Sequence, residues 1–275
     1  MSVLATNEWL KDYIKSKKNT RKEDFQIQQD FLCKSLTSYF QDATAYDIHL
    51  HLLNHGMFAP SRSDKEVIKA FFTQNYWNKT TKLISYLRKK WDGPDVPIMI
   101  FPSDHQNTYL QMELHGVNGL SYLDKCILFL PKETDNLRLK ALVTHEYNHV
   151  CRLQALEKSE SELNLLDGIV LEGLAEYAVL DLVGEKYLGK WTSLYDTELA
   201  KKYWEKWLSS NLSLKKSDER HELFMYGKGN IPKWLGYNAG FHLVSSYTEK
   251  HETSMNELLA LSSEVILEGS LFSDN

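Results

Sequence analysis

Two histidines lie four residues apart near the centre of the sequence, in His145-Glu146-Tyr147-Asn148-His149. Residues at i and i+4 of a helix lie one turn apart on the same face, so both imidazoles could bind one metal ion. Glu146 could then act as a general base on water at that ion. The flanking segments LRLKALVT and VCRLQAL are good helix formers. We therefore predict a helix that carries two zinc ligands and a base.

The motif alone does not establish a metal site. Its helix face should point inward, because the same face carries apolar side chains: Ala141, Leu142, Leu153 and Leu156. Buried imidazoles need hydrogen-bond partners. A pair of histidines at the edge of the core is therefore the alternative, and a third ligand would separate the two interpretations.

A second predicted helix carries the best candidate for that ligand, Glu172, in the segment LEGLAEY. Glu172 and Glu176 share an otherwise apolar stripe, where unpaired carboxylates would be costly. A divalent cation and its imidazoles would compensate that cost, and Gly173 would let the two helices approach closely. We predict that Glu172 binds Zn²⁺. Glu176 should accept a proton from the outer nitrogen of His145 or His149, with an ordinary salt bridge as the alternative.

Other third ligands fit less well. The metzincin pattern requires a glycine where this chain has Arg152, and a deformylase-like cysteine ligand would have to be Cys126, which lies in an apolar, strand-like run. The acidic residues in the polar break 157–162 (Glu157, Glu160 and Glu162) should be solvated. Asp167 is best interpreted as the N-cap of the second helix.

The elements that must position these residues indicate an α+β fold with a small mixed sheet. Residues 8–91 show mainly helical periodicity, and we expect strands at 96–101, 109–114 and 125–130 with a turn at 116–119. Helices should follow at 135–156, 167–182 and 194–208, then from Pro232, with a last one opened by the capping box Ser254-x-x-Glu257. We expect one catalytic unit over 1–275, with a helical N-terminal layer (1–95), the sheet and HExxH helix (96–160) and a helical C-terminal lobe (161–275).

Composition restricts the possible partners. The formal charge is −5 and the pI is near 6.1, which argues against nucleic acid as a partner. The basic stretch from Lys15 to Lys22 should be a solvated face. No segment matches a secretory signal or a membrane span, and the three cysteines form no CxxC pair. We expect a soluble, cytoplasmic protein; the sequence does not set its oligomeric state.

The combination of HExxH with a downstream EGLAEY helix resembles the gluzincin superfamily. More narrowly, GVNGLSY, THEYNHVCR, VLEGLAEY and LGYNAGFHLV resemble the YjaZ-like family of zinc-dependent proteases, over residues 96–251. The resemblance implies a thermolysin-like zincin fold, with an edge strand beside the cleft and the HExxH helix as its floor. It also implies an oxyanion-stabilising residue from the C-terminal lobe. We select Tyr237, with Tyr226 and His242 as alternatives. The GxMEN sequence of related aminopeptidases is not present, which favours an endopeptidase.

Three hypotheses follow. The first is an active zinc metallopeptidase that acts on peptides or proteins. The second is a catalytically inactive zinc-binding protein that regulates or binds peptides on the same scaffold. The third is a helical interaction protein with a chance HExxH, which predicts no stoichiometric metal. Elemental analysis separates the third hypothesis from the others.

Overall fold

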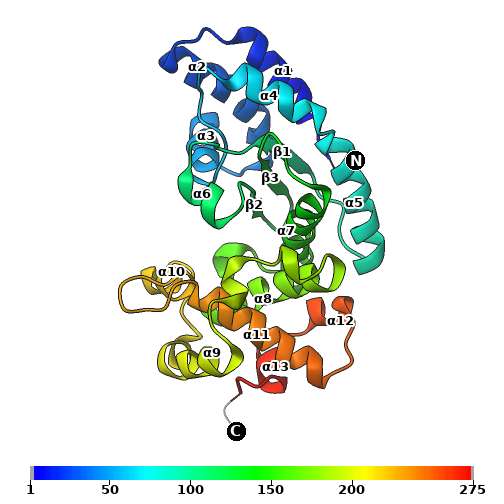
Figure 1. Ribbon diagram of the computed structural model, residues 1–275, viewed down its shortest axis with the longest axis vertical. Coiled ribbons are helices and arrows are strands. Elements are labelled where there is room, and N and C mark those ends of the chain that lie inside the picture. Colours follow the sequence, from blue (N-terminus) through cyan, green and yellow to red (C-terminus); the bar gives the residue numbers. More distant parts are fainter. Residues whose placement is uncertain (1–2, 274–275) are drawn as a thin grey trace. The chain divides into compact units, whose positions relative to one another are not determined.

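The structure is a computed structural model that describes residues 3–273, and it divides into two compact units (Figure 1). Within the described residues, unit 1 contains those up to 86, then 95–121 and 125–143. Unit 2 contains 87–94, 122–124 and 144–273. The described part of the chain has no helix that is long and apolar enough to cross a membrane.

A three-stranded mixed sheet forms the centre of unit 1, with the strand order β1-β3-β2. β1 (Ile98–Pro102) and β3 (Cys126–Leu130) are parallel, and every residue of both strands is buried. This burial explains why both strands are continuous apolar runs instead of alternating ones. β2 (Asn118–Ser121) pairs antiparallel with β3 and is half-buried. The strands predicted at 96–101 and 125–130 are therefore confirmed.

The strand predicted at 109–114 is wrong, because this segment forms helix α6 (Thr108–Glu113). The side chain of Asn107 caps the helix by accepting a hydrogen bond from the Leu110 backbone N–H at 3.0 Å. Leu110 is buried, whereas Tyr109 and Met112 are exposed. The apolar residues of this segment suggested a strand, but only Leu110 is buried, and the other two are exposed on a short helix.

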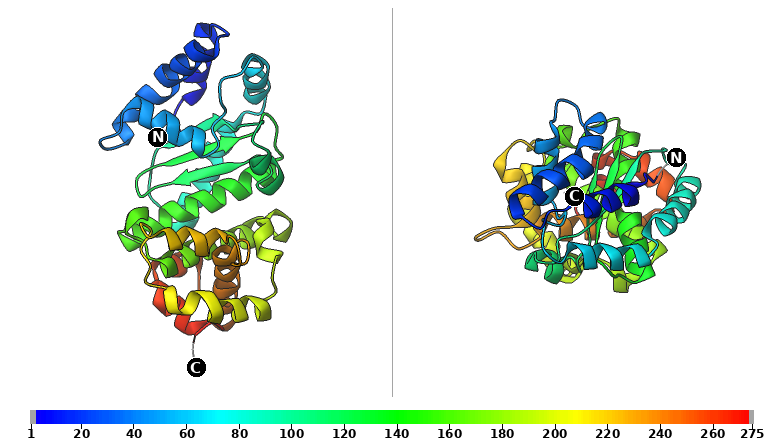
Figure 2. Two further views of the ribbon diagram at one scale, coloured as in Figure 1. Left: turned by 90° about the vertical axis from the view of Figure 1, so that its left-hand side faces the viewer. Right: turned by 90° about the horizontal axis from the view of Figure 1, so that it is seen from above.

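The helices predicted before residue 91 are confirmed. Between α2 and α3 the chain forms a π-helical turn (Gln29–Cys33) and a 3₁₀ helix (Lys34–Tyr39). Unit 1 packs these helices around the sheet (Figure 2), and the bridge from Val3 to Ile98 extends the outer edge of β1. The five helices are α1 (Thr6–Ser16), α2 (Arg21–Gln28), α3 (Ala45–Asn54), α4 (Asp64–Thr73) and α5 (Tyr76–Trp91).

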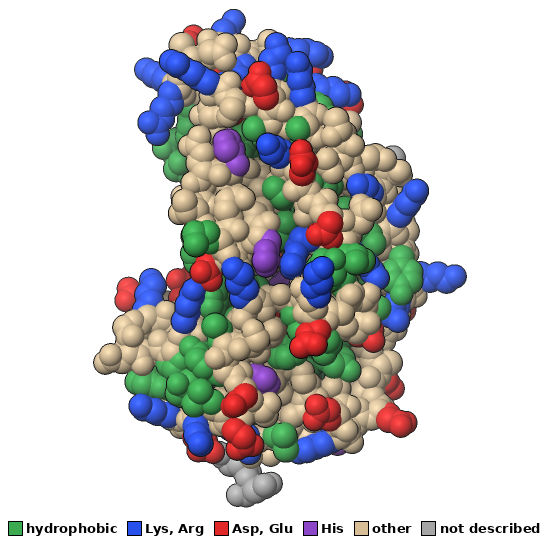
Figure 3. Space-filling view, in the orientation of Figure 1, with side chains coloured by type: hydrophobic (Ala, Val, Ile, Leu, Met, Phe, Trp, Pro, Cys, Tyr) green, Lys and Arg blue, Asp and Glu red, His purple; other side chains and the backbone are tan. Residues whose placement is uncertain are grey.

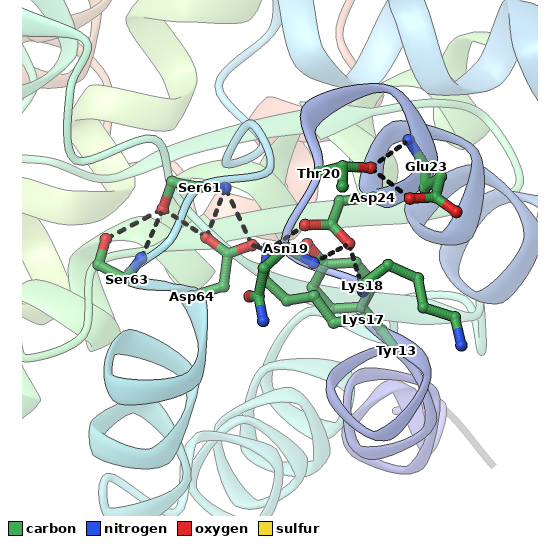
Figure 4. A network of polar contacts seen from close by, with 10 residues as sticks. All are labelled: Tyr13, Lys17, Lys18, Asn19, Thr20, Glu23, Asp24, Ser61, Ser63 and Asp64. Atoms are coloured by element: carbon green, nitrogen blue, oxygen red, sulfur yellow. Dashed lines mark hydrogen bonds and ion pairs between the residues drawn. The ribbon is translucent and has the colours of Figure 1, made fainter.

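A buried ion-pair network joins α1, α2 and α4 (Figure 4). Lys17 Nζ lies 2.5 Å from Asp24 Oδ2 and 3.4 Å from Asp64 Oδ2, and all three side chains are at most 5% exposed. Tyr13 donates a hydrogen bond to Asp64 at 2.5 Å. The prediction that the basic stretch is solvated is thus wrong for Lys17, whose charge is compensated by two carboxylates. The other basic residues of the stretch are exposed, and Figure 3 shows Lys and Arg side chains gathered over these helices.

Unit 2 is helical, and α8 (Leu165–Leu182) lies at its centre, buried on nearly every face. α11 (Leu235–Lys250) packs along α8 (Figure 1). The capping box at Ser254 and Glu257 is confirmed, and the segment predicted at 194–208 is a helix with a π-helical last turn, Trp204–Leu208. The other helices of unit 2 are α9 (Thr197–Tyr203), α10 (Glu219–Tyr226), α12 (Met255–Ala260) and α13 (Ser263–Gly269). The helix α7 (Asn136–Leu156) begins in unit 1 and continues in unit 2 from residue 144.

Two details of α8 differ from the sequence prediction. Asn164, and not Asp167, is the N-cap; Asp167 is the third residue of a capping box and also accepts a hydrogen bond from Ser263 Oγ at 2.7 Å. Gly173 approaches α11, and not the HExxH helix. A Cβ at Gly173 would lie 2.2 Å from the carbonyl oxygen of Gly240, so the two backbones are nearly in contact. Any larger residue at Gly173 would force α8 and α11 apart.

Arg152 explains why the chain has no glycine after the HExxH motif. Its side chain is completely buried and donates hydrogen bonds to the carbonyl oxygens of Leu259, at 2.8 Å, and Leu261, and to Ser263 Oγ at 3.2 Å. The Leu259 carbonyl belongs to the last turn of α12 and Leu261 follows that helix, where carbonyl groups lack partners within the helix. Arg152 thus fixes the C-terminal segment to α7.

Candidate metal centre

Three side chains from α7 and α8 converge in unit 2. His145 Nε2 lies 3.4 Å from Glu172 Oε2, and His149 Nε2 lies 3.6 Å from the same oxygen. One ligand atom from each of the three residues lies within 4.8 Å of the others. The imidazole rings are one helical turn apart and nearly perpendicular, with centroids 4.5 Å apart. The structure therefore brings together His145, His149 and Glu172, the three ligands predicted from the sequence.

The two nitrogen-to-oxygen distances fit a tetrahedral zinc ion. Ligand atoms at about 2.0–2.1 Å from zinc are about 3.4 Å from each other in tetrahedral geometry. The two nitrogen-to-oxygen distances, 3.4 and 3.6 Å, are close to this value and longer than most hydrogen bonds. Glu172 Oε2 is buried, and no described residue donates a hydrogen bond to it. Since a buried carboxylate oxygen without a hydrogen-bond donor is costly, the site is compatible with a bound cation.

The titration of this cluster is dominated by its own members. Burial lowers the pKa of His145, but the neighbouring carboxylates of Glu172 and Glu176 outweigh burial and raise it well above its usual value. Burial raises the pKa of Glu172, and the neighbouring His149 and His145 outweigh burial and lower it. Glu172 is thus ionised, and its negative charge faces the imidazoles of His145 and His149.

Glu176 fixes the first histidine. Its Oε1 atom lies 3.0 Å from His145 Nδ1, and its Oε2 atom accepts a hydrogen bond from the Gly189 backbone N–H at 2.9 Å. The side chain is almost completely buried. With Nδ1 bound to a carboxylate, Nε2 of His145 is left to bind a metal ion. Between the two histidines offered by the sequence prediction, the structure pairs Glu176 with His145.

Glu146 follows His145 on α7 and is 7% exposed. His145 and Glu172 each keep about 15% of the side chain exposed, so the cluster is accessible to a small molecule such as water. The acidic residues rejected as ligands, Glu157 and Glu162, are exposed as predicted. The side chain of Glu160 lies outside the described residues.

Tyr237 on α11 lies beside Glu172. Burial raises the pKa of the Tyr237 phenol, and the Glu172 carboxylate and Tyr226 raise it further. Tyr237 lies one turn before Gly240, the residue that contacts Gly173. Since Gly173 follows Glu172, the close packing of α8 and α11 brings Tyr237 to the cluster.

The two alternatives to Tyr237 lie in different places. Tyr226 Oη accepts a hydrogen bond from Tyr237 Oη at 3.1 Å, so Tyr226 is part of the same site. His242 bonds to Thr197 Oγ1 at 3.1 Å and to the Tyr195 carbonyl oxygen at 2.8 Å. Both of its ring nitrogens are therefore engaged with the segment 195–197.

Sequence reasoning missed the segment that follows α8. Gly189 binds Glu176, and Trp191 contacts Tyr237 with centroids 5.4 Å apart. Asn238 donates to the carbonyl oxygens of Trp191 (2.8 Å) and Tyr195 (3.1 Å). The buried amide of Asn238, within LGYNAG, was the one available signal that this helix fixes a distant loop.

Comparison with known proteins agrees with this geometry. A family described as predicted Zn-dependent protease matches residues 76–268. The uncharacterized protein YjaZ of Bacillus subtilis (strain 168) is 36% identical over 221 residues, which are 80% of this chain and 85% of YjaZ. The uncharacterized protein YjfC of the same organism is 26% identical over 186 residues, 64% of this chain and 61% of YjfC. No solved structure matches the chain.

Proposed function

Because the chain belongs to the YjaZ-like family of predicted Zn-dependent proteases, we propose that it is a zinc peptidase in which His145, His149 and Glu172 hold the metal and Glu146 is the base. The observation that carries the proposal is the position of Glu172 Oε2, within 3.6 Å of both Nε2 atoms and without a hydrogen-bond donor among the described residues. A bound cation would compensate the charge of this buried carboxylate, which supports the metal site.

When bound, Zn²⁺ acts as a Lewis acid that polarises a peptide carbonyl and makes water nucleophilic near neutral pH. Glu146 takes a proton from the attacking water and then gives it to the leaving amine. Glu176 holds His145 with Nε2 toward the cluster. Tyr237, whose raised pKa keeps the phenol protonated, would turn its single O–H from Tyr226 to the developing oxyanion and donate its hydrogen bond there.

The finer assignment is part of the same proposal. A third ligand from a second helix supports the gluzincin type and a thermolysin-like arrangement, and the chain lacks the GxMEN sequence, which supports an endopeptidase. The substrate would be a peptide or protein. We also propose a cytoplasmic location, which the three buried, free cysteines support.

The test of the proposal is Glu146→Gln. This change keeps the size of the side chain but removes the base, so the variant should retain zinc and lose at least about 100-fold of the peptidase activity. Glu157→Gln, at an exposed glutamate that follows α7, is the matched control and should keep both. The readouts are zinc content and digestion of an unbiased peptide library.

Full activity in Glu146→Gln would refute the base. A wild-type protein with stoichiometric zinc and no hydrolysis would instead favour the inactive zinc-binding alternative, which the family scaffold also allows.

A further inference from the structure

Four aromatic side chains pack against one another beside Glu172. Tyr237 contacts Trp191, Trp234 and Tyr226, with centroids 5.4, 4.8 and 5.3 Å apart. Trp234 also contacts Trp191 at 5.0 Å and Tyr226 at 5.3 Å. All five separations lie in the range of favourable aromatic contacts. We call Trp191, Tyr226, Trp234 and Tyr237 the aromatic cluster.

Tyr226 is the most exposed member of the cluster. Trp191 is 9% and Trp234 is 5% exposed, and Tyr237 is half-buried, whereas Tyr226 is 41% exposed. The Tyr237 hydroxyl donates to the Tyr226 hydroxyl at 3.1 Å. The exposed ring is thus one hydrogen bond from the residue that lies beside Glu172. An exposed aromatic ring is thus linked through Tyr237 to the proposed catalytic centre.

The backbone that carries the cluster is fixed in an unusual conformation. Trp234 has φ = 58°, in the left-handed region that large residues rarely adopt. Its N–H donates to the Tyr226 carbonyl oxygen at 2.7 Å, and its carbonyl accepts from Asn238 N–H at 2.9 Å. Gly227 has φ = +73°, and a Cβ there would lie 2.0 Å from the Pro232 carbonyl oxygen. Such conformations persist where the surroundings enforce them, and they concentrate at ligand sites.

The opposite side of the cluster is fixed as well. Asn238 binds the carbonyl oxygen of Trp191, and Gly189 binds Glu176, so the segment 189–195 is attached to both α8 and α11. These contacts already fix the residues of the cluster, so a ligand that packs on it would cause little further loss of conformational entropy. Preorganised aromatic surfaces bind apolar groups at low entropic cost.

We propose that the aromatic cluster is the substrate-recognition surface of this peptidase, and that Tyr226 selects peptides with an aromatic side chain next to the scissile bond. This inference rests on the proposed function. The exposed ring of Tyr226 packs on Tyr237, so an aromatic substrate side chain that packs on Tyr226 gains both buried area and ring contact. A phenylalanine should be preferred to an alanine by on the order of tenfold in kcat/KM.

The test uses pairs of fluorogenic peptides that differ only by Phe or Ala at one position beside the cleaved bond, with a third peptide carrying Arg. The zinc-loaded full chain is compared with Tyr226→Phe and Tyr226→Ala. Tyr86→Ala, at a tyrosine of unit 1 that is 49% exposed, is the matched control. Zinc content and the far-UV spectrum of each variant are measured in parallel.

We expect the Phe/Ala ratio of kcat/KM to be about ten in the wild type, in Tyr226→Phe and in Tyr86→Ala, and to fall toward one in Tyr226→Ala. Using a ratio within each variant removes any change in overall rate from the lost hydrogen bond to Tyr237. Cleavage without a Phe preference, a preference for Arg, or an unchanged ratio in Tyr226→Ala would overturn the proposal.

Failure of the proposed function gives a different result, namely no zinc-dependent cleavage of any peptide. The recognition surface is then tested by binding of the same Phe and Ala peptides to the zinc-loaded protein in calorimetry. Tighter binding of the Phe peptide that is lost in Tyr226→Ala would support the surface, and equal binding would refute it.

Discussion

Replacement of Gly173 by alanine tests how α8 and α11 position the site. A Cβ at this position would lie 2.2 Å from the carbonyl oxygen and 2.5 Å from the carbonyl carbon of Gly240. Both obstacles are backbone atoms, so no side-chain rotation relieves the overlap. The helices would have to separate by more than about 1 Å to reach ordinary contact distance.

Two opposing effects set the magnitude. Alanine is favoured over glycine in a helix interior by about 1 kcal/mol. Overpacking costs up to about 3 kcal/mol when the structure must shift. The net loss in the free energy of unfolding should be about 2 kcal/mol, which corresponds to a Tm decrease of about 4–8 °C for a chain of this size.

Gly168→Ala on the same helix is the matched control. A Cβ at Gly168 would lie 3.3 Å from the His221 ring, a side chain that can move slightly. Its stability should stay the same or rise by up to about 1 kcal/mol. Both variants are compared with the wild type by urea and thermal unfolding after zinc is removed by chelation, so that metal binding does not contribute. If Gly173→Ala is as stable as Gly168→Ala, the account of this helix contact is wrong.

Two further predictions concern stability. Arg152→Met should lower the free energy of unfolding by about 3 kcal/mol or more, because buried carbonyl groups at Leu259 and Leu261 lose their donor. Urea unfolding measures this loss, and hydrogen exchange should show faster opening of α12 and α13. Unchanged exchange in these two helices would contradict the role of Arg152 in holding them to α7. Burial lowers the pKa of His49 to about 4 from an unfolded value near 6.5, so the unfolded chain binds the extra proton first. Stability from this group is complete above pH 6.5 and is lost as the pH falls toward 4, by about 2 kcal/mol between pH 7 and pH 5. Urea midpoints of the metal-free wild type should show this slope and those of His49→Gln should show less of it; equal slopes would refute the assignment.

Local sequence signals predicted the parts of the site that one helix contains. His145 and His149 are one turn apart on α7, and the carboxylates of Glu172 and Glu176 face them from α8, as their apolar stripe indicated. The buried strands β1 and β3 could also be predicted from the sequence, since continuous apolar runs between Gly or Pro residues are typical of such strands.

Contacts between distant segments were not predictable in the same way. Gly173 was expected to face α7, because only the spacing within α8 was visible; its partner Gly240 is 67 residues away in the sequence. The structure has Asn164 and not Asp167 as the N-cap for a local reason, since Asn and Asp are both preferred at N-caps and these two residues are three positions apart. The aromatic cluster depends on three separate segments, and no periodicity connects Trp191 with Tyr226.

The account's central claim is a zinc ion held by His145, His149 and Glu172, and elemental analysis of Glu172→Gln tests it most directly. After zinc loading and gel filtration, the wild type and the control Asp181→Asn, at an exposed carboxylate of α8, should each carry one zinc per chain. Glu172→Gln should carry clearly less than one, with an unchanged helical spectrum. Equal zinc in Glu172→Gln and the wild type, or a wild type without stoichiometric zinc, would contradict the claim.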